Sequence, residues 1–252
     1  MPTPGHRLFA RYAYAPNALG YCGPEDTHTL ESVACGSGGD ADVPSLARRF
    51  SGAWPYQRLV AELSGIADPL DEEVGRAYWT GSELTDRIDR NRFGRRLLDR
   101  LAAQAGHYWA HLTPELLGEA APTHAFHVFG VYPWSRLLGS GAPQPLQVLD
   151  SCRIGWGTVT EVREHDTVVR SSPLVFDGTA LGLGPDRECV TRYRVPGGGT
   201  FVSDLSVGDR VAMHWDFVCD RLDTQQEASL EFWTRWQLER TNLRLAARAH
   251  ND

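Results

Sequence analysis

The strongest constraint on the fold is a change of pattern across one stretch, Leu137–Gln147 (LLGSGAPQPLQ). This stretch is rich in glycine, proline and serine, a composition typical of linkers. Before it, apolar residues recur at helical spacing, and after it, short β-prone segments alternate with turn signals. This change of period predicts an α+β protein with helices first and strands later.

The part before the linker is predicted to be mainly helical. The segment PSLARRFSGAWPYQRLVAELSGI has apolar residues at helical spacing. Pro55 is expected either to interrupt this helix or to begin a second one. Residues 68–112 predict two or three further amphipathic helices, with His107 and His111 on one helix face. The first forty residues contain two turn-rich segments, PNALGYCGPED and ACGSGGDAD. The buried side of the predicted helices is expected to carry Leu84, Ile88, Leu97, Leu98 and Leu101.

The part after the linker is predicted to form short strands and a closing helix. Several short strands at this spacing indicate a small barrel or sandwich. Asp223 is a candidate N-cap of the helix, and Gln226 completes a capping-box pattern. We expect two domains, 1–140 and 148–252. The predicted strands are 152–162, 167–171, 174–176, 189–194 and 210–219.

Composition limits the classes of function. The formal net charge is -7, which argues against a general nucleic-acid binder. No apolar run approaches the roughly 20 residues that a membrane-spanning helix needs. The N-terminal residues show no continuous apolar segment of a signal peptide. We therefore expect a cytoplasmic protein without membrane partners.

The cysteines indicate isolated thiols. Their number, five, is odd, and no CxxC pair is present. A disulfide framework and a four-ligand structural zinc site are therefore not expected.

A histidine lies within a run of large apolar residues, VGDRVAMHWDFVCDRLD. If residues 210–219 form one strand, His214 and Asp216 share the face opposite the core. Asp216 could then accept a proton from one imidazole nitrogen and leave the other nitrogen free to bind a metal. The alternative is a histidine on a half-exposed strand. The face expected toward the core carries Val211, Met213, Trp215 and Phe217.

Cys152 begins the strand-forming part. A thiolate and an imidazole together suit iron or another transition metal. Two protein ligands, Cys152 and His214, suit a metal fragment that brings its own ligands. The alternative is that Cys152 is a small buried apolar residue.

Residues 152–252 resemble the HypC/HupF hydrogenase assembly chaperones. The matching stretches are CRIGWGTVTEV and GDRVAMHWDFVCDRLDTQQEA. In that family the cysteine follows the initiator methionine, whereas here residues 1–151 precede it. Trp215 and Asp216 replace a small pair after the histidine. The spacing agrees at Gly208, Asp209, Val211, His214, Phe217, Leu222 and Asp223.

The resemblance implies an OB-like barrel and a role in the maturation of [NiFe]-hydrogenase. It implies that Cys152 is the thiolate that binds iron or the partner protein, with His214 as its companion, and that the iron is bound transiently with cyanide and carbonyl ligands. It also implies that the partners are the hydrogenase large subunit or other maturation proteins, and that the protein is not itself an enzyme. The stretches RYAYAPNALGYCGPEDT, AYWTGSEL and HAFHVFGVYPW resemble an actinobacterial family of unknown function found alongside hydrogenase genes.

The N-terminal part offers a second possible site. His124 and His127 lie three apart in PTHAFHVFGVYPW, which is predicted to be a strand or irregular segment with structural histidines. Cys22 lies in a Gly/Pro turn and would need a nearby base to act as a nucleophile. The alternative function is thus an enzyme that uses Cys22, His124 or His127, with the barrel delivering a partner or cofactor. A third possibility is an interaction module without metal.

Overall fold

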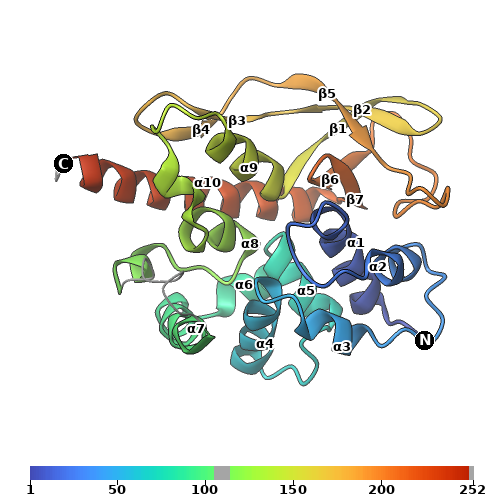
Figure 1. The fold of residues 1–252 in the computed structure, drawn as a ribbon, viewed down its shortest axis with the longest axis horizontal. Coiled ribbons are helices and arrows are strands. Elements are labelled where there is room, and N and C mark those ends of the chain that lie inside the picture. Colours follow the sequence, from blue (N-terminus) through green and yellow to red (C-terminus); the bar gives the residue numbers. More distant parts are fainter. Residues whose placement is uncertain (105–113, 250–252) are drawn as a thin grey trace.

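A computed structural model describes residues 1–104 and 114–249 of the chain. The α+β class predicted from the sequence is confirmed (Figure 1). N-terminal helices lie on one side, a five-stranded sheet lies on the other, and the long helix α10 (Thr224–Ala249) runs between them. The predicted helix face with His107 and His111 lies outside the described residues.

The N-terminal half contains seven helices within its described residues. The turn-rich start of the chain also contains two of them, α1 and α2, which the sequence analysis did not predict. Pro55 lies in the first turn of α4, so it begins a second helix rather than breaking a long one. The helices are α1 (Pro4–Ala18), α2 (Thr27–Ala34), α3 (Val43–Arg48), α4 (Ala53–Ser64), α5 (Glu72–Trp79), α6 (Glu83–Arg87) and α7 (Arg90–Gln104).

Shorter helical segments connect this half to the sheet. The predicted linker is partly helical, because α9 (Gln144–Cys152) includes its last four residues. The segment predicted as a strand or irregular, 122–134, is also helical: α8 (His124–Phe126) continues into a π-helical turn, η3 (His127–Val131). Two 3-10 turns flank it, η2 (Pro114–Glu119) and η4 (Pro133–Leu137).

Five strands form a sheet in the order β1-β2-β5-β7-β6, and β6 also pairs with β1, so the sheet closes on itself. β5 and β7 meet through one parallel pair, Arg192 with Phe217. A separate hairpin joins β3 to β4. The strands are β1 (Gly155–Val162), β2 (Asp166–Ser171), β3 (Leu174–Phe176), β4 (Leu181–Leu183), β5 (Arg187–Arg192), β6 (Arg210–His214) and β7 (Phe217–Arg221).

The predicted strand 210–219 is wrong, because the chain turns back within it. β6 and β7 form a hairpin whose two-residue turn is Trp215–Asp216. Both turn residues have positive φ, 51° and 55°, as a type I′ turn requires. The reversal changes the alternation of side chains, so Trp215 and Phe217 do not share the core of Val211 and Met213.

Two hydrophobic cores result. A small one fills the inside of the five-stranded sheet, and its buried members are Val159, Val169, Tyr193, Val202, Val211, Met213 and Val218. The large one begins in α1 and extends through the helices to Trp215, Phe217 and Cys219 and on to α10. The parts on either side of residues 140–148 therefore share one continuous core.

The closing helix begins as predicted. The Gln226 amide donates to the Asp223 carboxylate at 2.8 Å, and the Asp223 amide donates to the Gln226 side chain at 3.0 Å. This is a capping box, which satisfies two amides that a helix start leaves free. α10 packs on α8, η2, η3 and β4, beneath the sheet in Figure 1. No described helix is both long and apolar enough to cross a bilayer.

Candidate metal centre

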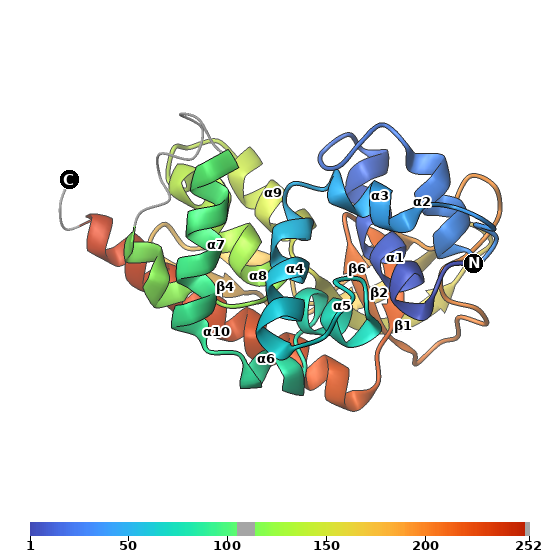
Figure 2. The same cartoon turned by 90° about the horizontal axis from the view of Figure 1, so that it is seen from below.

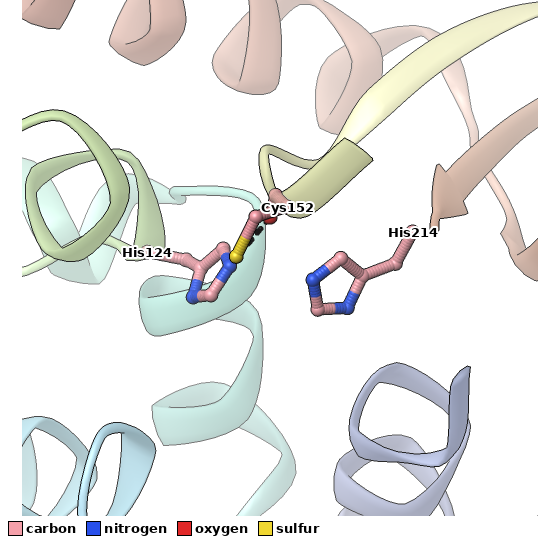
Figure 3. Close-up of side chains that lie close together, drawn as sticks. All are labelled: His124, Cys152 and His214. Atoms are coloured by element: carbon pink, nitrogen blue, oxygen red, sulfur yellow. Dashed lines mark hydrogen bonds between the residues drawn. The ribbon is translucent and has the colours of Figure 1, made fainter. Parts of the chain in front are cut away.

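Three potential metal ligands meet where the helices pack on the sheet. His124 begins α8, Cys152 ends α9, and His214 ends β6 (Figure 3). One donor atom from each of the three side chains lies within 4.8 Å of the other two. Their exposed fractions are 4%, 8% and 2%, so the group is buried.

The His214 side chain is oriented with one nitrogen free. Its Nδ1 lies 2.7 Å from the backbone oxygen of Tyr12, in α1. Because a carbonyl oxygen only accepts, Nδ1 carries the proton and Nε2 presents a lone pair. That buried Nε2 has no partner in hydrogen-bond geometry within the described residues, although the Cys152 backbone oxygen lies close enough to raise the pKa of His214. Metal-binding histidines characteristically have this arrangement, in which a carbonyl holds one nitrogen while the other binds the ion.

Asp216 does not have the role predicted from a continuous strand. The hairpin turn leaves Asp216 exposed and away from His214, and its backbone oxygen accepts from the Arg192 amide at 2.9 Å. The Tyr12 carbonyl orients His214 instead. Nothing in the local sequence indicates this pairing, because 202 residues separate the two partners.

His124 is fixed by hydrogen bonds at both ring nitrogens. Its Nε2 donates to the backbone oxygen of Cys152 at 2.9 Å. Its Nδ1 therefore accepts from the Tyr78 hydroxyl, at 3.0 Å, and Tyr78 comes from α5. Coordination of a metal through Nε2 would replace the bond to Cys152, and Nδ1–H would then donate to the Tyr78 oxygen.

Two further candidates from the sequence lie beside the group. His127 is buried in the π-helical turn, and the His124 and His127 rings are 5.8 Å apart. Cys22 lies in the loop between α1 and α2. Asn17 fixes this loop by donating to the backbone oxygens of Cys22 and Pro24. Neither residue belongs to the group whose donor atoms lie within 4.8 Å.

The Trp215 turn connects that loop to the centre. The ring of Tyr21, next to Cys22, stacks on the ring of Trp215 with centroids 3.9 Å apart. The Trp215 amide donates to the oxygen of Ser151, which precedes Cys152. The structure thus gathers the two predicted sites, Cys152/His214 and Cys22/His124/His127, into one region.

Burial keeps the side chains of the centre neutral. Desolvation lowers the pKa of His214 to about 4 and that of His127 to about 3, and it lowers the pKa of His124 well below its usual value. Desolvation raises the pKa of the Cys152 thiol to about 12, and the nearby Cys22 thiol adds to this rise. A cation would therefore meet two neutral imidazoles and would displace the thiol proton on binding.

An aromatic shell surrounds the centre. Trp79 has its ring centroid 4.9 Å from that of His124 and 6.0 Å from that of His214. Tyr12 stacks on Trp79 at 5.2 Å. Such a shell excludes water and lowers the local dielectric, which strengthens the binding of an ion once it is inside.

The whole-chain comparison is consistent with the shared core. A family model described as a family of unknown function (DUF6390) matches residues 1–248. The chain belongs to the DUF6390 family. No curated protein and no solved structure matches it. The match covers both the helices that supply His124 and the strands that supply His214, so the three candidate ligands lie within the extent of DUF6390.

Proposed function

We propose that the protein binds a transition-metal ion through His124, Cys152 and His214. One sulfur and two nitrogen donors suit zinc, iron or copper rather than calcium or magnesium. The observation that carries the proposal is the orphaned Nε2 of His214, buried beside a thiol and a second imidazole. An unpaired buried polar atom costs free energy, and a metal ion would remove that cost.

Three protein ligands favour a reactive or carrier site over a purely structural one. Structural zinc sites are closed by four protein ligands, whereas catalytic sites keep a position for water or substrate. In this centre the open position would be available to a small ligand. Cyanide or carbonyl on an iron fragment would meet this requirement.

Delivery of iron to [NiFe]-hydrogenase is the more specific role that the resemblance to HypC/HupF chaperones suggests, and we retain it as part of the proposal. Convergence of Cys152 and His214 supports it. The depth of the site adds a condition, because release of a fragment would require the helices and the sheet to separate locally. Infrared spectra of protein coexpressed with hydrogenase maturation factors would test it, since cyanide and carbonyl bands should appear and should be absent in Cys152→Ala.

An enzyme with a Cys22 nucleophile receives no support from the geometry. Burial raises the pKa of Cys22 to about 12, so its thiol is protonated at neutral pH. Desolvation also keeps the neighbouring imidazoles uncharged, and no hydrogen bond from a described base to the Cys22 sulfur is present. Activity at this region would therefore depend on the metal.

Cobalt titration provides the direct test of metal binding. Adding Co²⁺ to metal-free protein should produce a thiolate-to-cobalt charge-transfer band and d–d bands of a four-coordinate ion, with a Kd below about 1 µM. Cys152→Ser should remove the charge-transfer band, and His214→Ala should weaken binding at least about 100-fold. Cys35→Ser is the matched control, because Cys35 is a free, partly buried thiol outside the centre. Absence of stoichiometric binding by Zn²⁺, Co²⁺ or Fe²⁺ would refute the proposal.

A further inference from the structure

A groove lies between α5, α6 and the first turns of α10, which run side by side in Figure 2. Its volume is about 810 Å³, within the roughly 300–1,000 Å³ of typical ligand sites. Gln225 of α10 bridges to Glu83 of α6 at 3.3 Å, which connects the two walls. None of the residues that line the groove belongs to the metal centre.

The groove is strongly acidic. Five carboxylates and two guanidiniums line it, an excess of three negative charges. Both guanidiniums are already paired, Arg76 with Asp220 and Glu72, and Arg87 with Glu83. Among the described residues, no ion pair is formed by the other three carboxylates, which belong to Glu73, Asp86 and Asp223. An occupant would therefore carry positive charge.

The groove also offers an aromatic surface. Phe232 is 56% exposed, although large aromatic side chains are normally buried. It packs edge-on against Trp233, with ring centroids 5.3 Å apart. An exposed aromatic ring beside carboxylates is a favourable site for a guanidinium, which can stack on the ring and bind a carboxylate with its edge.

Trp233 provides a second, independent indication of a ligand. It lines the groove, is only 5% exposed, and its Nε1–H has no acceptor within the described residues. Gly81 lies against this indole so closely that a Cβ there would be 2.3 Å from Trp233 Cδ1. Because Nε1 is buried under Gly81, a peptide carbonyl at this end of the groove would supply the missing acceptor when the Gly81 turn moves away from the indole.

We propose that this groove binds an arginine-bearing, partly apolar peptide segment of a partner protein. Arginine side chains pair with Glu73, Asp86 and Asp223, and an apolar side chain covers Phe232. The segment's backbone reaches Trp233 Nε1 as the Gly81 turn moves aside. The inference does not depend on the metal centre. It adds to the proposed function a surface by which the protein is recognised.

Fluorescence anisotropy with two synthetic probes tests the groove. One probe is a labelled amphipathic dodecapeptide of arginine, leucine and glutamine, and the other has glutamate in place of each arginine. At a physiological salt concentration only the arginine peptide should bind. Phe232→Ala and the double variant Glu73→Gln/Asp86→Asn should each weaken it about tenfold.

Leu243→Ala is the matched control, because Leu243 is a 62% exposed apolar residue farther along the same helix. It should change the Kd less than twofold. The proposal would be overturned if both peptides bound equally or if the arginine peptide did not bind. It would also be overturned if Phe232→Ala and Leu243→Ala lowered the affinity for the arginine peptide equally. These substitutions are at exposed positions, so circular dichroism should show unchanged folding, and cobalt binding should be unaffected.

Discussion

The two sides of β6 lead into two different interiors. On one side, Val211 and Met213 fill the inside of the sheet with apolar residues, and the buried Thr191 hydroxyl there is paired with the Met213 sulfur at 3.6 Å. On the other side, Ala212 and His214 face the helices. Unpaired buried atoms concentrate there, including Tyr56 Oη, His127 Nδ1 and His214 Nε2. The first interior serves stability alone, whereas the second accepts an energetic cost that a bound ion would offset.

Acidification should distinguish the two interiors most strongly. Unfolded histidines bind protons below pH 6.5, but His124, His127 and His214 resist protonation in the folded state because burial lowers each pKa. The unfolded state therefore binds more protons, and stability falls as pH drops below about 6.5. Between pH 7.5 and 5.5, the free energy of unfolding of the metal-free protein should fall by about 3–4 kcal/mol.

Urea unfolding at both pH values measures this loss. In His127→Phe, the fall in the free energy of unfolding between the two pH values should be about a third smaller. The reason is that His127 is one of the three histidines that burial keeps unprotonated. An unchanged fall in the free energy of unfolding in this variant would mean that groups other than the buried histidines cause it.

Neighbouring residues on β6 should separate stability from metal affinity. Met213→Ala should lower the free energy of unfolding by about 2–3 kcal/mol because it leaves a cavity inside the sheet. It should leave cobalt affinity within threefold (about 0.7 kcal/mol). His214→Ala should weaken cobalt binding at least about 100-fold. It should also lower the free energy of unfolding, because it leaves a cavity and an unpaired Tyr12 carbonyl, so cobalt affinity is the quantity that separates the two variants. A comparable loss of cobalt affinity in Met213→Ala would show that the interiors are not independent.

Removal of one orienting hydroxyl should give an intermediate effect. Tyr78→Phe deletes the hydrogen-bond partner of His124 Nδ1 while the ring stays in place. Loss of such a partner typically weakens metal affinity about 10-fold or more. Tyr14→Phe is the control, since Tyr14 packs on Phe201 and Phe217 away from the three ligands. Equal cobalt affinities for the two variants would exclude coordination by His124 in the orientation described.

Cys22→Ser should have the smallest effect. Cys22 lies near Cys152 but outside the three-residue group, so cobalt affinity should change less than threefold. The charge-transfer intensity per cobalt should also stay the same. A halved intensity would identify Cys22 as an additional thiolate ligand and would revise the ligand set.

Local patterns determined much of the secondary structure. The change from helices to strands after residue 140 and the Asp223–Gln226 cap are present in the fold. The strand predicted at 152–162 begins only at Gly155, because Cys152 is the last residue of α9. Two predictions failed where several local signals competed. The aromatic-rich segment 122–134 looked β-prone but is helical, and the apolar run 210–219 concealed a turn at Trp215–Asp216. A type I′ turn normally uses glycine or asparagine, so these residues gave no turn signal.

The sequence by itself determined the α+β class and a short set of chemically capable residues. These residues are Cys152, His214, His124, His127 and Cys22. Tertiary structure alone decided that they lie in one region, that they are buried, and that Tyr12 and Tyr78 orient the imidazoles. The physical reason is that side-chain periodicity predicts only which residues of one helix or strand share a face. A binding site depends on contacts between elements that are far apart in the chain.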